Sequence, residues 1–332
     1  MCCHAEFKQD AECAFVFNDN FANCDSMFRN KHPKQSIWII GILSLVGNAL
    51  VLIWRTFYKE KNVVQTIMLM HVAVADALMG VYLITIGVFD AVWSGVYYLH
   101  DFQWRTGLRC QIIGGIAVLS SEVSIMVLSL LSVERVKNIV FPYRYKALNR
   151  KKAHAFCFFI WVISFLIAFL PTFGIRYFHD PEKGIYYYGK SVVCLPMQLY
   201  PKFTSAWEYS VAIFVGLNLA LVAIIIVAYG MIFMKTCLSK WRLAHQGTRR
   251  EKRARARTAN TKRETSLAKR LLFIVATDCF CWLPIIVIGL GSVIEDSQFL
   301  LPGDIAVWIA VFVLPLNSAV NPGLYTFSTS HV

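Results

Sequence analysis

The sequence predicts an all-α membrane protein, built as a bundle of seven transmembrane helices. Two observations predict it. Apolar residues make up 57% of the 332-residue chain and charged residues only 16%, whereas ordinary soluble domains carry about 25% charged residues. In addition, seven apolar runs reach the roughly 20 residues that an α-helix needs to cross a bilayer.

The seven spans follow one another along most of the chain. Four of the apolar runs, 36–54, 155–175, 209–234 and 305–327, hold no charged side chain. The other three, 66–89, 111–133 and 271–294, hold one carboxylate each, namely Asp76, Glu122 and Asp278. Glycines and prolines inside the runs do not count against them, because helices in a membrane tolerate both. The predicted spans are 36–57, 65–90, 107–139, 153–175, 207–236, 265–294 and 303–327.

The basic residues predict the orientation. Of the 33 Lys and Arg residues, 23 lie in the connections on one side of the predicted bundle and 10 on the other. Cytoplasmic connections carry the excess of basic residues, so we expect the N-terminus outside the cell. The run RREKRARAR at 249–257 is then expected to lie near anionic lipid headgroups. Nucleic-acid binding is a poor explanation for the net charge of +13.

Residues 1–35 are predicted to be an extracellular cysteine-rich hinge. Cys2, Cys3, Cys13 and Cys24 crowd into this segment, and four cysteines allow three pairings, among which the sequence does not choose. We expect the chain to begin partway through a larger extracellular domain. Residues 328–332 are expected to be a truncated cytoplasmic tail.

The other cysteines fall into two groups. Cys110 begins the third span at its outer end, and Cys194 lies in the long outer loop 176–208. A disulfide between them would hold that loop over the bundle. The remaining four are expected to stay reduced in the spans or on the cytoplasmic side: Cys157, Cys237, Cys279 and Cys281.

The three carboxylates inside the spans predict a polar core. A charged side chain at the bilayer centre costs about 2.5–3.5 kcal/mol, so each must face the bundle and find partners. Three interpretations remain open: hydrogen-bonded residues that hold helices together, a switchable polar network, or a proton relay. Pro284 and Pro322 would kink their helices and are candidate pivots. The candidate partners are Asn48, Ser120, Ser121, Ser124, Asn317, Ser318 and Asn321.

Motifs on these spans resemble those of the rhodopsin-like G-protein-coupled receptors. In chain order they are NALVL, VAVAD, Cys110, SVERV, Trp161, CWLP and NPGLY, and they cover about residues 36–327. A narrower group of motifs is similar to the leucine-rich-repeat-containing receptors, with the relaxin-type receptors fitting best. These are ADALMGVYL, LSSEVS, the proline-free GLNLAL, Asp278 and LPLNSAVNPGLYT.

The pair at the inner rim of the third span gains a role from this resemblance. We expect Arg135 to pair with its neighbour Glu134, and the resemblance adds Glu264 at the base of the sixth span. Exposed ion pairs contribute only about 0–1 kcal/mol, so such a latch would bias an equilibrium between states. The alternative is an interfacial pair that solvates the helix end.

The resemblance also implies a sodium pocket and an activation switch. Carboxylate, carbonyl and hydroxyl oxygens suit a hard cation, and sodium bound at Asp76 would favour the inactive state; no other cofactor is expected. The pocket residues are Asn48, Asp76, Ser124, Asn317 and Asn321. The switch residues are Asp278, Trp282, Pro284, Pro322 and Tyr325.

The sequence therefore predicts a plasma-membrane receptor that passes a peptide-hormone or hinge signal to a heterotrimeric G protein. The resemblance favours the stimulatory type, which raises cAMP, with the hormone held by a leucine-rich-repeat ectodomain that this chain lacks. The segment Phe21–Phe28 would act as an internal agonist or as a mere tether. No catalytic constellation indicates an enzyme. A non-signalling decoy receptor is the main alternative, and a transporter or channel is a weaker one.

Overall fold

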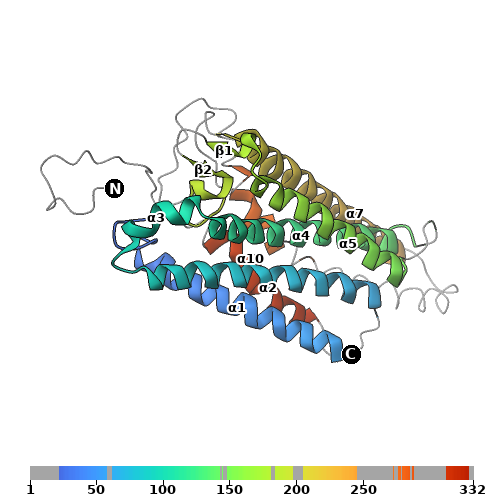
Figure 1. Ribbon diagram of the computed structural model, residues 1–332. Coiled ribbons are helices and arrows are strands. Elements are labelled where there is room, and N and C mark those ends of the chain that lie inside the picture. Colours follow the sequence, from blue (N-terminus) through green and yellow to red (C-terminus); the bar gives the residue numbers. More distant parts are fainter. Residues whose placement is uncertain are drawn as a thin grey trace, which may run out of the picture.

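The computed structural model describes most of the chain. The described residues are 22–57, 62–142, 144, 148–180, 184–196, 205–244, 272, 276–277, 279–284, 286–287 and 312–328. The longer helices are α1 (Lys31–Phe57), α2 (Val63–Val92), α3 (Tyr97–Thr106), α4 (Leu108–Ile139), α5 (Arg150–Phe169), α7 (Asn218–Ala244) and α10 (Leu314–Ser328). Figure 1 shows the long helices packed side by side as a bundle.

Five described helical runs are long and apolar enough to cross a membrane. They are Lys31–Phe57, Val63–Val92, Leu108–Ile139, Arg150–Thr172 and Trp207–Leu238. Each overlaps one of the first five predicted spans. The predicted sixth span is described only in pieces, and the predicted seventh is described from Phe312 onward.

The fifth run changes its winding near its start. It begins with α6 (Trp207–Ser210), continues as a π-helix, η4 (Val211–Leu217), and then becomes α7. A π-helical turn inserts extra backbone and shifts the face that the following residues present, and such turns are frequent at functional sites. Asn218, the first residue of α7, is fully buried.

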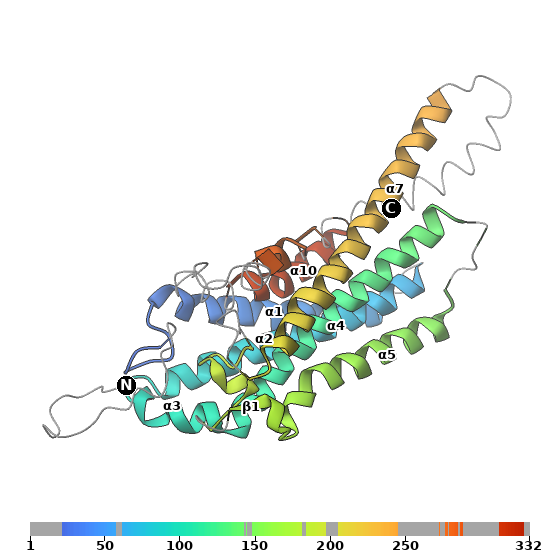
Figure 2. The same ribbon diagram turned by 90° about the horizontal axis from the view of Figure 1, so that it is seen from above.

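Helix α4 lies at the centre of the bundle. It packs against α2, α5 and α7, as Figure 2 shows from above. The most apolar stretch of α4 is 72% buried inside the protein, against 22% for the span formed by α5. Polar side chains on α4 therefore meet other helices, whereas most of α5 faces lipid.

Helices α1 and α2 approach each other closely where a glycine leaves room. A Cβ atom added to Gly80 would lie 2.6 Å from the backbone nitrogen of Leu45 and 2.9 Å from the carbonyl oxygen of Gly41. Small residues allow this backbone approach in membrane helix packing. The contact fixes the position of α1 along the axis of α2, and therefore the position of Asn48 relative to Asp76.

One end of the bundle carries a cap of short elements, and we call it the disulfide end. The cap contains α3 and an antiparallel hairpin of β1 (His179–Asp180) and β2 (Ile185–Tyr186), with His179 opposite Tyr186. Three 3₁₀ turns complete it: η1 (Leu170–Thr172), η2 (Arg176–Phe178) and η3 (Tyr187–Lys190). The opposite end, where α4 carries Arg135, is the Arg135 end. Figure 2 shows α7 reaching past the other helices there.

Candidate functional site

Asp76 is the centre of a polar cluster that joins three helices. Its side chain is fully buried on α2. The carboxylate atom Oδ1 accepts hydrogen bonds from Ser124 Oγ on α4 (3.3 Å) and Ser318 Oγ on α10 (3.0 Å). Its Oδ2 accepts one from Asn321 Nδ2 at 2.7 Å. Three donors around one carboxylate satisfy most of the acceptor sites that burial has removed from water.

Asn48 connects α1 to the same cluster. Its amide Nδ2 donates to the carbonyl oxygens of Ser44 (2.8 Å) and Ser318 (2.9 Å). Ser318 therefore contacts both Asn48 and Asp76, through its carbonyl and its hydroxyl. The expected set of Asn48, Asp76, Ser124 and Asn321 is brought together, and Asn317 is buried one turn before Asn321 on α10.

The cluster holds oxygen atoms that could bind a cation. Asn48 Oδ1 and Asn321 Oδ1 are both buried, and neither has a hydrogen-bond partner among the described residues. A buried acceptor without a hydrogen-bond partner costs free energy, and a donor, a water molecule or an ion beside it removes that cost. Carbonyl oxygens beside a carboxylate form a donor set that suits Na⁺. The residues present therefore fit the sodium ion expected from the sequence.

Glu122 forms a second polar contact, nearer the disulfide end. It is fully buried on α4, and its Oε1 accepts a hydrogen bond from Asn218 Nδ2 at 3.2 Å. The π-helix η4 ends directly before Asn218. This contact joins α4 to α7, whereas the Asp76 cluster joins α2, α4 and α10. Asp76 and Glu122 thus belong to two separate polar sites in the bundle.

The Arg135 end corrects one expectation. Glu134 pairs with Lys137, at 3.5 Å between Oε2 and Nζ, and the predicted pair with Arg135 is not formed within the described residues. The reason is helical geometry, because adjacent residues point about 100° apart while residues three apart share a face. Oε1 of Glu134 also accepts hydrogen bonds from Asn138 Nδ2 and from the backbone N–H of Leu148, both at 3.3 Å.

Arg135 itself is buried on α4 and faces α7. Its side chain is 3% exposed, and it interacts electrostatically with Tyr229. The other expected latch residue, Glu264, lies outside the described residues. Glu134 therefore holds the loop after α4, while Arg135 turns toward the bundle.

The expected switch residues are described in part. Trp282 is 4% exposed and packs in an apolar cluster with Ile125, Val222 and Ile286. Pro322 contacts α1 closely, since a Cβ added to Gly47 would lie 2.9 Å from its Cγ. Pro284 is partly buried. Asp278 and the side chain of Tyr325 lie outside the described residues.

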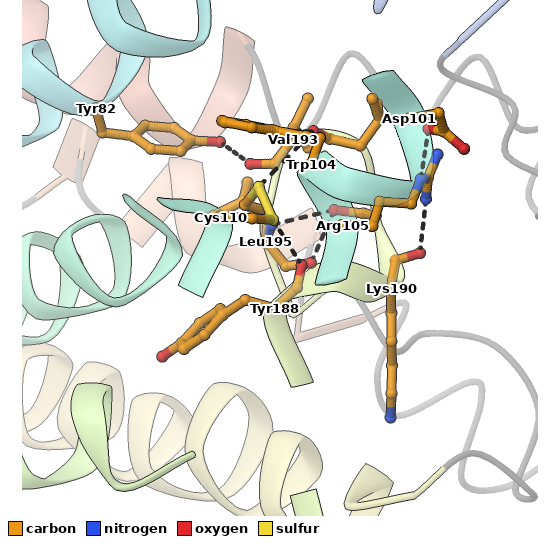
Figure 3. Close-up of a disulfide and its surroundings, with 12 residues drawn as sticks. Tyr82, Asp101, Trp104, Arg105, Cys110, Tyr188, Lys190, Val193 and Leu195 are labelled. Carbon is orange, nitrogen blue, oxygen red and sulfur yellow. Dashed lines mark hydrogen bonds and ion pairs between the residues drawn. A yellow bond between two sulfur atoms is a disulfide. The ribbon is translucent and has the colours of Figure 1, made fainter. Parts of the chain in front are cut away.

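A disulfide between Cys110 and Cys194 holds the long loop over the bundle, as expected, with 5.3 Å between the Cα atoms. Backbone carbonyls of the loop accept further hydrogen bonds from the helices, as Figure 3 shows. Tyr82 Oη donates to the carbonyl of Val193 and Trp104 Nε1 to that of Val192, both at 2.8 Å. The loop is therefore fixed on α2 and α3 as well as on α4.

The described part of the hinge docks on the same end of the bundle. Met27 and Phe28 are buried, and the backbone N–H of Met27 donates to Asp90 Oδ1 at 3.1 Å. Asp90 also pairs with Lys34 on α1, at 3.0 Å. No sequence pattern marks this site, because Asp90 directly follows an apolar run and resembles an ordinary charged residue at the end of a span.

Backbone bonds strengthen this docking. The N–H of Tyr98 donates to the carbonyl of Cys24 at 3.0 Å, and the N–H of Gly95 donates to that of Asp25 at 2.6 Å. Cys24 is disulfide-bonded. The other hinge cysteines, Cys2, Cys3 and Cys13, lie outside the described residues.

Comparisons with known proteins agree with this architecture. Residues 47–325 match the family model of the 7 transmembrane receptor (rhodopsin family). The structure resembles squid rhodopsin with a TM-score of 0.69 and 21% identity, covering 90% of this chain and 81% of that one. This likeness confirms the seven-helix, all-α fold.

Relatives in sequence are receptors. The chain is 38% identical over 315 residues to the G-protein coupled receptor GRL101 of Lymnaea stagnalis, covering 94% of this chain and 26% of that protein. It is 32% identical to relaxin receptor 1 of Homo sapiens, covering 98% and 42%. Against the thyrotropin receptor of Felis catus, identity is 30%, covering 94% and 37%.

The chain thus spans less than half the length of these relatives. The similarity to relaxin-type receptors that the motifs predicted is confirmed, as is the prediction that the chain is not an enzyme. The chain belongs to the rhodopsin family of seven-transmembrane receptors and is a multi-pass membrane protein.

Proposed function

We propose that this chain is the signalling bundle of a plasma-membrane receptor that activates a heterotrimeric G protein, with its N-terminus outside the cell. The observation that carries the proposal is the Asp76 cluster, because it joins three helices through one buried carboxylate. Packed cores change between discrete arrangements rather than over a continuous range, and the Asp76 cluster lies in such a core. An agonist would act by preferring one arrangement, and its differential affinity sets how far the equilibrium moves.

Sodium is the proposed ligand of the inactive arrangement. Asp76 would supply the anionic oxygen, and the oxygen atoms of Asn48, Ser124, Asn317 and Asn321 would complete the pocket. The ion would favour the state in which α2, α4 and α10 converge on it. An agonist that favours the other arrangement of the bundle would then weaken the binding of sodium.

The input proposed for the receptor is the hinge, moved by a peptide or protein hormone that binds outside this chain. Burial of Met27 and Phe28 and the bonds to Asp90 support this, since a segment docked on α1 and α2 can transmit a shift to them. The proposed output is at the Arg135 end, where Arg135 and Glu264 restrain the sixth span. Asp278, Trp282, Pro284, Pro322 and Tyr325 are the proposed hinge and packing residues between input and output.

The stimulatory G protein is the proposed partner. The test is guanine-nucleotide exchange on purified stimulatory G protein by the 332-residue chain in lipid nanodiscs, with cAMP accumulation in cells as a second readout. An inhibitory and a Gq-type protein serve as matched controls. Exchange above the empty-disc level on the stimulatory protein supports the proposal. Exchange on none of the three, with the disulfide intact and the protein folded, would favour the decoy receptor.

A further inference from the structure

A groove between α4 and α7 opens on the outer surface of the bundle, toward the Arg135 end. Its volume is about 330 Å³, and every residue that lines it is apolar. Its lining includes Val133 and Val136 of α4 and Ala223, Val227, Ala228 and Met231 of α7.

The groove faces the surroundings of the protein. Val136 and Ala228 form its floor and are 7% and 2% exposed, while Val133 and Val227 on its walls are 41% and 59% exposed. These residues lie within spans that cross the membrane, so lipid chains are what their exposed surface contacts. A hollow of this kind loses dispersion contacts unless a chain fills it.

Two basic side chains lie just beyond one end of the groove. Lys137 lies four residues after Val133 on α4, and Lys235 lies four residues after Met231 on α7, so each continues the helix face that lines the groove. Lys235 is exposed and has no ion pair with any described residue. Lys137 forms an ion pair with Glu134, with 3.5 Å between Nζ and Oε2, so part of its charge is balanced. Of these two lysines, Lys235 therefore supplies more of the positive charge available to a ligand.

We propose that this groove binds one anionic phospholipid, with an acyl chain along the apolar lining and the phosphate near Lys235 and Lys137. An apolar slot that ends in ammonium groups matches the layout of such a lipid. The inference rests on the orientation given under the proposed function, which places the Arg135 end at the anionic cytoplasmic leaflet. Val136 directly follows Arg135, so a bound lipid contacts the helix segment that carries the proposed output.

The test is photocrosslinking of the purified chain in phosphatidylcholine nanodiscs, with peptide mapping of the adducts. The probes are phosphatidylserine and phosphatidylcholine that carry the same diazirine in mid-chain. Each lysine near the surface contributes about 1 kcal/mol, or about fivefold in affinity. We therefore expect about fivefold more adduct from the serine probe on residues 133–136 and 223–231. Unlabelled phosphatidylserine should compete, and unlabelled phosphatidylcholine should not.

Paired variants separate the groove from the general lipid shell. Ala223→Trp fills the groove from an exposed position and should abolish the preferred adducts, whereas Ile226→Trp on the same helix should keep them, because Ile226 is 61% exposed and does not line the groove. Lys235→Gln should reduce the labelling by the serine probe to that of the choline probe, while Lys151→Gln leaves it high. Adducts spread evenly over all the spans, or unchanged in Ala223→Trp, would refute the site.

Equal labelling by the two probes would refute recognition of the headgroup and with it the anionic lipid. Competition by a water-soluble phosphoserine would assign the site to a free phosphate and overturn the lipid proposal. If Ala223→Trp fails to fold, the competition in the unaltered chain decides alone. None of these readouts uses a G protein, so the lipid site and the proposed function can fail separately.

Discussion

At the residue scale, Asp76 combines an ionisable carboxyl group with complete burial. Its three hydrogen-bond donors come from Ser124, Ser318 and Asn321, on two different helices. A carboxylate that loses water on burial keeps its charge only where donors or a cation replace the water. Asp76 therefore couples the positions of α2, α4 and α10 to its own charge.

Replacing that charge tests the proposed sodium site. In Asp76→Asn, the new amide group donates where the carboxylate accepted, and Asn321 can turn its free Oδ1 toward it. The cluster stays packed but loses its anion. We expect the basal nucleotide exchange of the unaltered chain to rise when NaCl is replaced by N-methylglucamine chloride. The variant should show the same exchange in both salts.

A Ser164→Ala variant provides the control, because Ser164 is also fully buried and its hydroxyl donates to Met126 Sδ and to no polar group of the Asp76 cluster among the described residues. It should retain the response to sodium. A sodium response that persists in Asp76→Asn would assign the ion to another site.

Glu122 gives a prediction about stability. Glu122→Ala leaves the buried amide of Asn218 without its acceptor, and such a loss costs about 1–3 kcal/mol. Glu122→Gln retains an acceptor at the same place and should cost less. We expect the apparent Tm of the purified protein to fall in the order unaltered chain, Gln variant, Ala variant. Equal Tm values for the two variants would mean that the Asn218 contact contributes nothing.

The candidate partners of Asp76 could be predicted from the sequence because few polar groups lie in the spans, and the resemblance reduced them to Asn48, Ser124, Asn317 and Asn321. Within the described residues Glu134 pairs with Lys137 and not with its neighbour Arg135, because residues three apart share a helix face and adjacent residues do not. Ser318 entered only as one candidate among seven, since a serine in an apolar run gives no sign of the helix that it faces. Asp90 was missed because its buried partner, the backbone of Met27, has no signal in the sequence.

At the element scale, α4 carries the determinants of the Arg135 end. Glu134 holds the loop through Leu148, and this fixes the end of α4 in place. Arg135 is buried and interacts electrostatically with Tyr229 of α7. The two adjacent residues thus act on different partners, one on a loop and one on a helix.

Arg135→Ala separates signalling from folding. The arginine is 3% exposed at a helix end, and its removal takes away the charge that faces α7. We expect nucleotide exchange to fall to the empty-disc level while surface expression remains. Lys152→Ala is the matched control, since it removes an exposed charge at the same end of the bundle. Unchanged exchange in Arg135→Ala would remove it from the proposed output.

The sequence predicted the long helices because apolar run length alone determines them in a membrane. The smaller elements had no comparable signal. Helix α3 has ten residues of mixed polarity, and it is positioned by tertiary contacts such as that of Trp104 with Val192. The π-helix before Asn218 was equally invisible, because its winding depends on packing and no residue type marks it.

At the scale of the whole molecule, three polar sites follow one another along the bundle. Asp90 holds the hinge at the disulfide end, Asp76 joins the helices within the bundle, and Arg135 faces α7 at the far end. Asp90 and Asp76 share α2, so a shift of that helix moves both. Coupling between distant sites requires an element with two arrangements that both sites bias, and α2 is the described element that carries both Asp90 and Asp76.

Loosening the hinge therefore tests the coupling. Asp90→Asn can still accept the N–H of Met27 but loses the ion pair with Lys34. Hydrogen bonds to charged groups contribute about 1.5–3 kcal/mol, so neutralising the acceptor should speed amide exchange at Met27 about tenfold. Glu208→Gln is the control, because Glu208 is a carboxylate at the same end that accepts a hydrogen bond from Tyr177 in the loop and has no hydrogen bond or ion pair with residues 22–35, the described part of the hinge. If the docked hinge holds the bundle in one arrangement, Asp90→Asn must change both the amide exchange of the hinge and the basal nucleotide exchange. Glu208→Gln must change neither. Faster amide exchange with unchanged nucleotide exchange would make the hinge a tether, whereas a change in both would make it part of the switch.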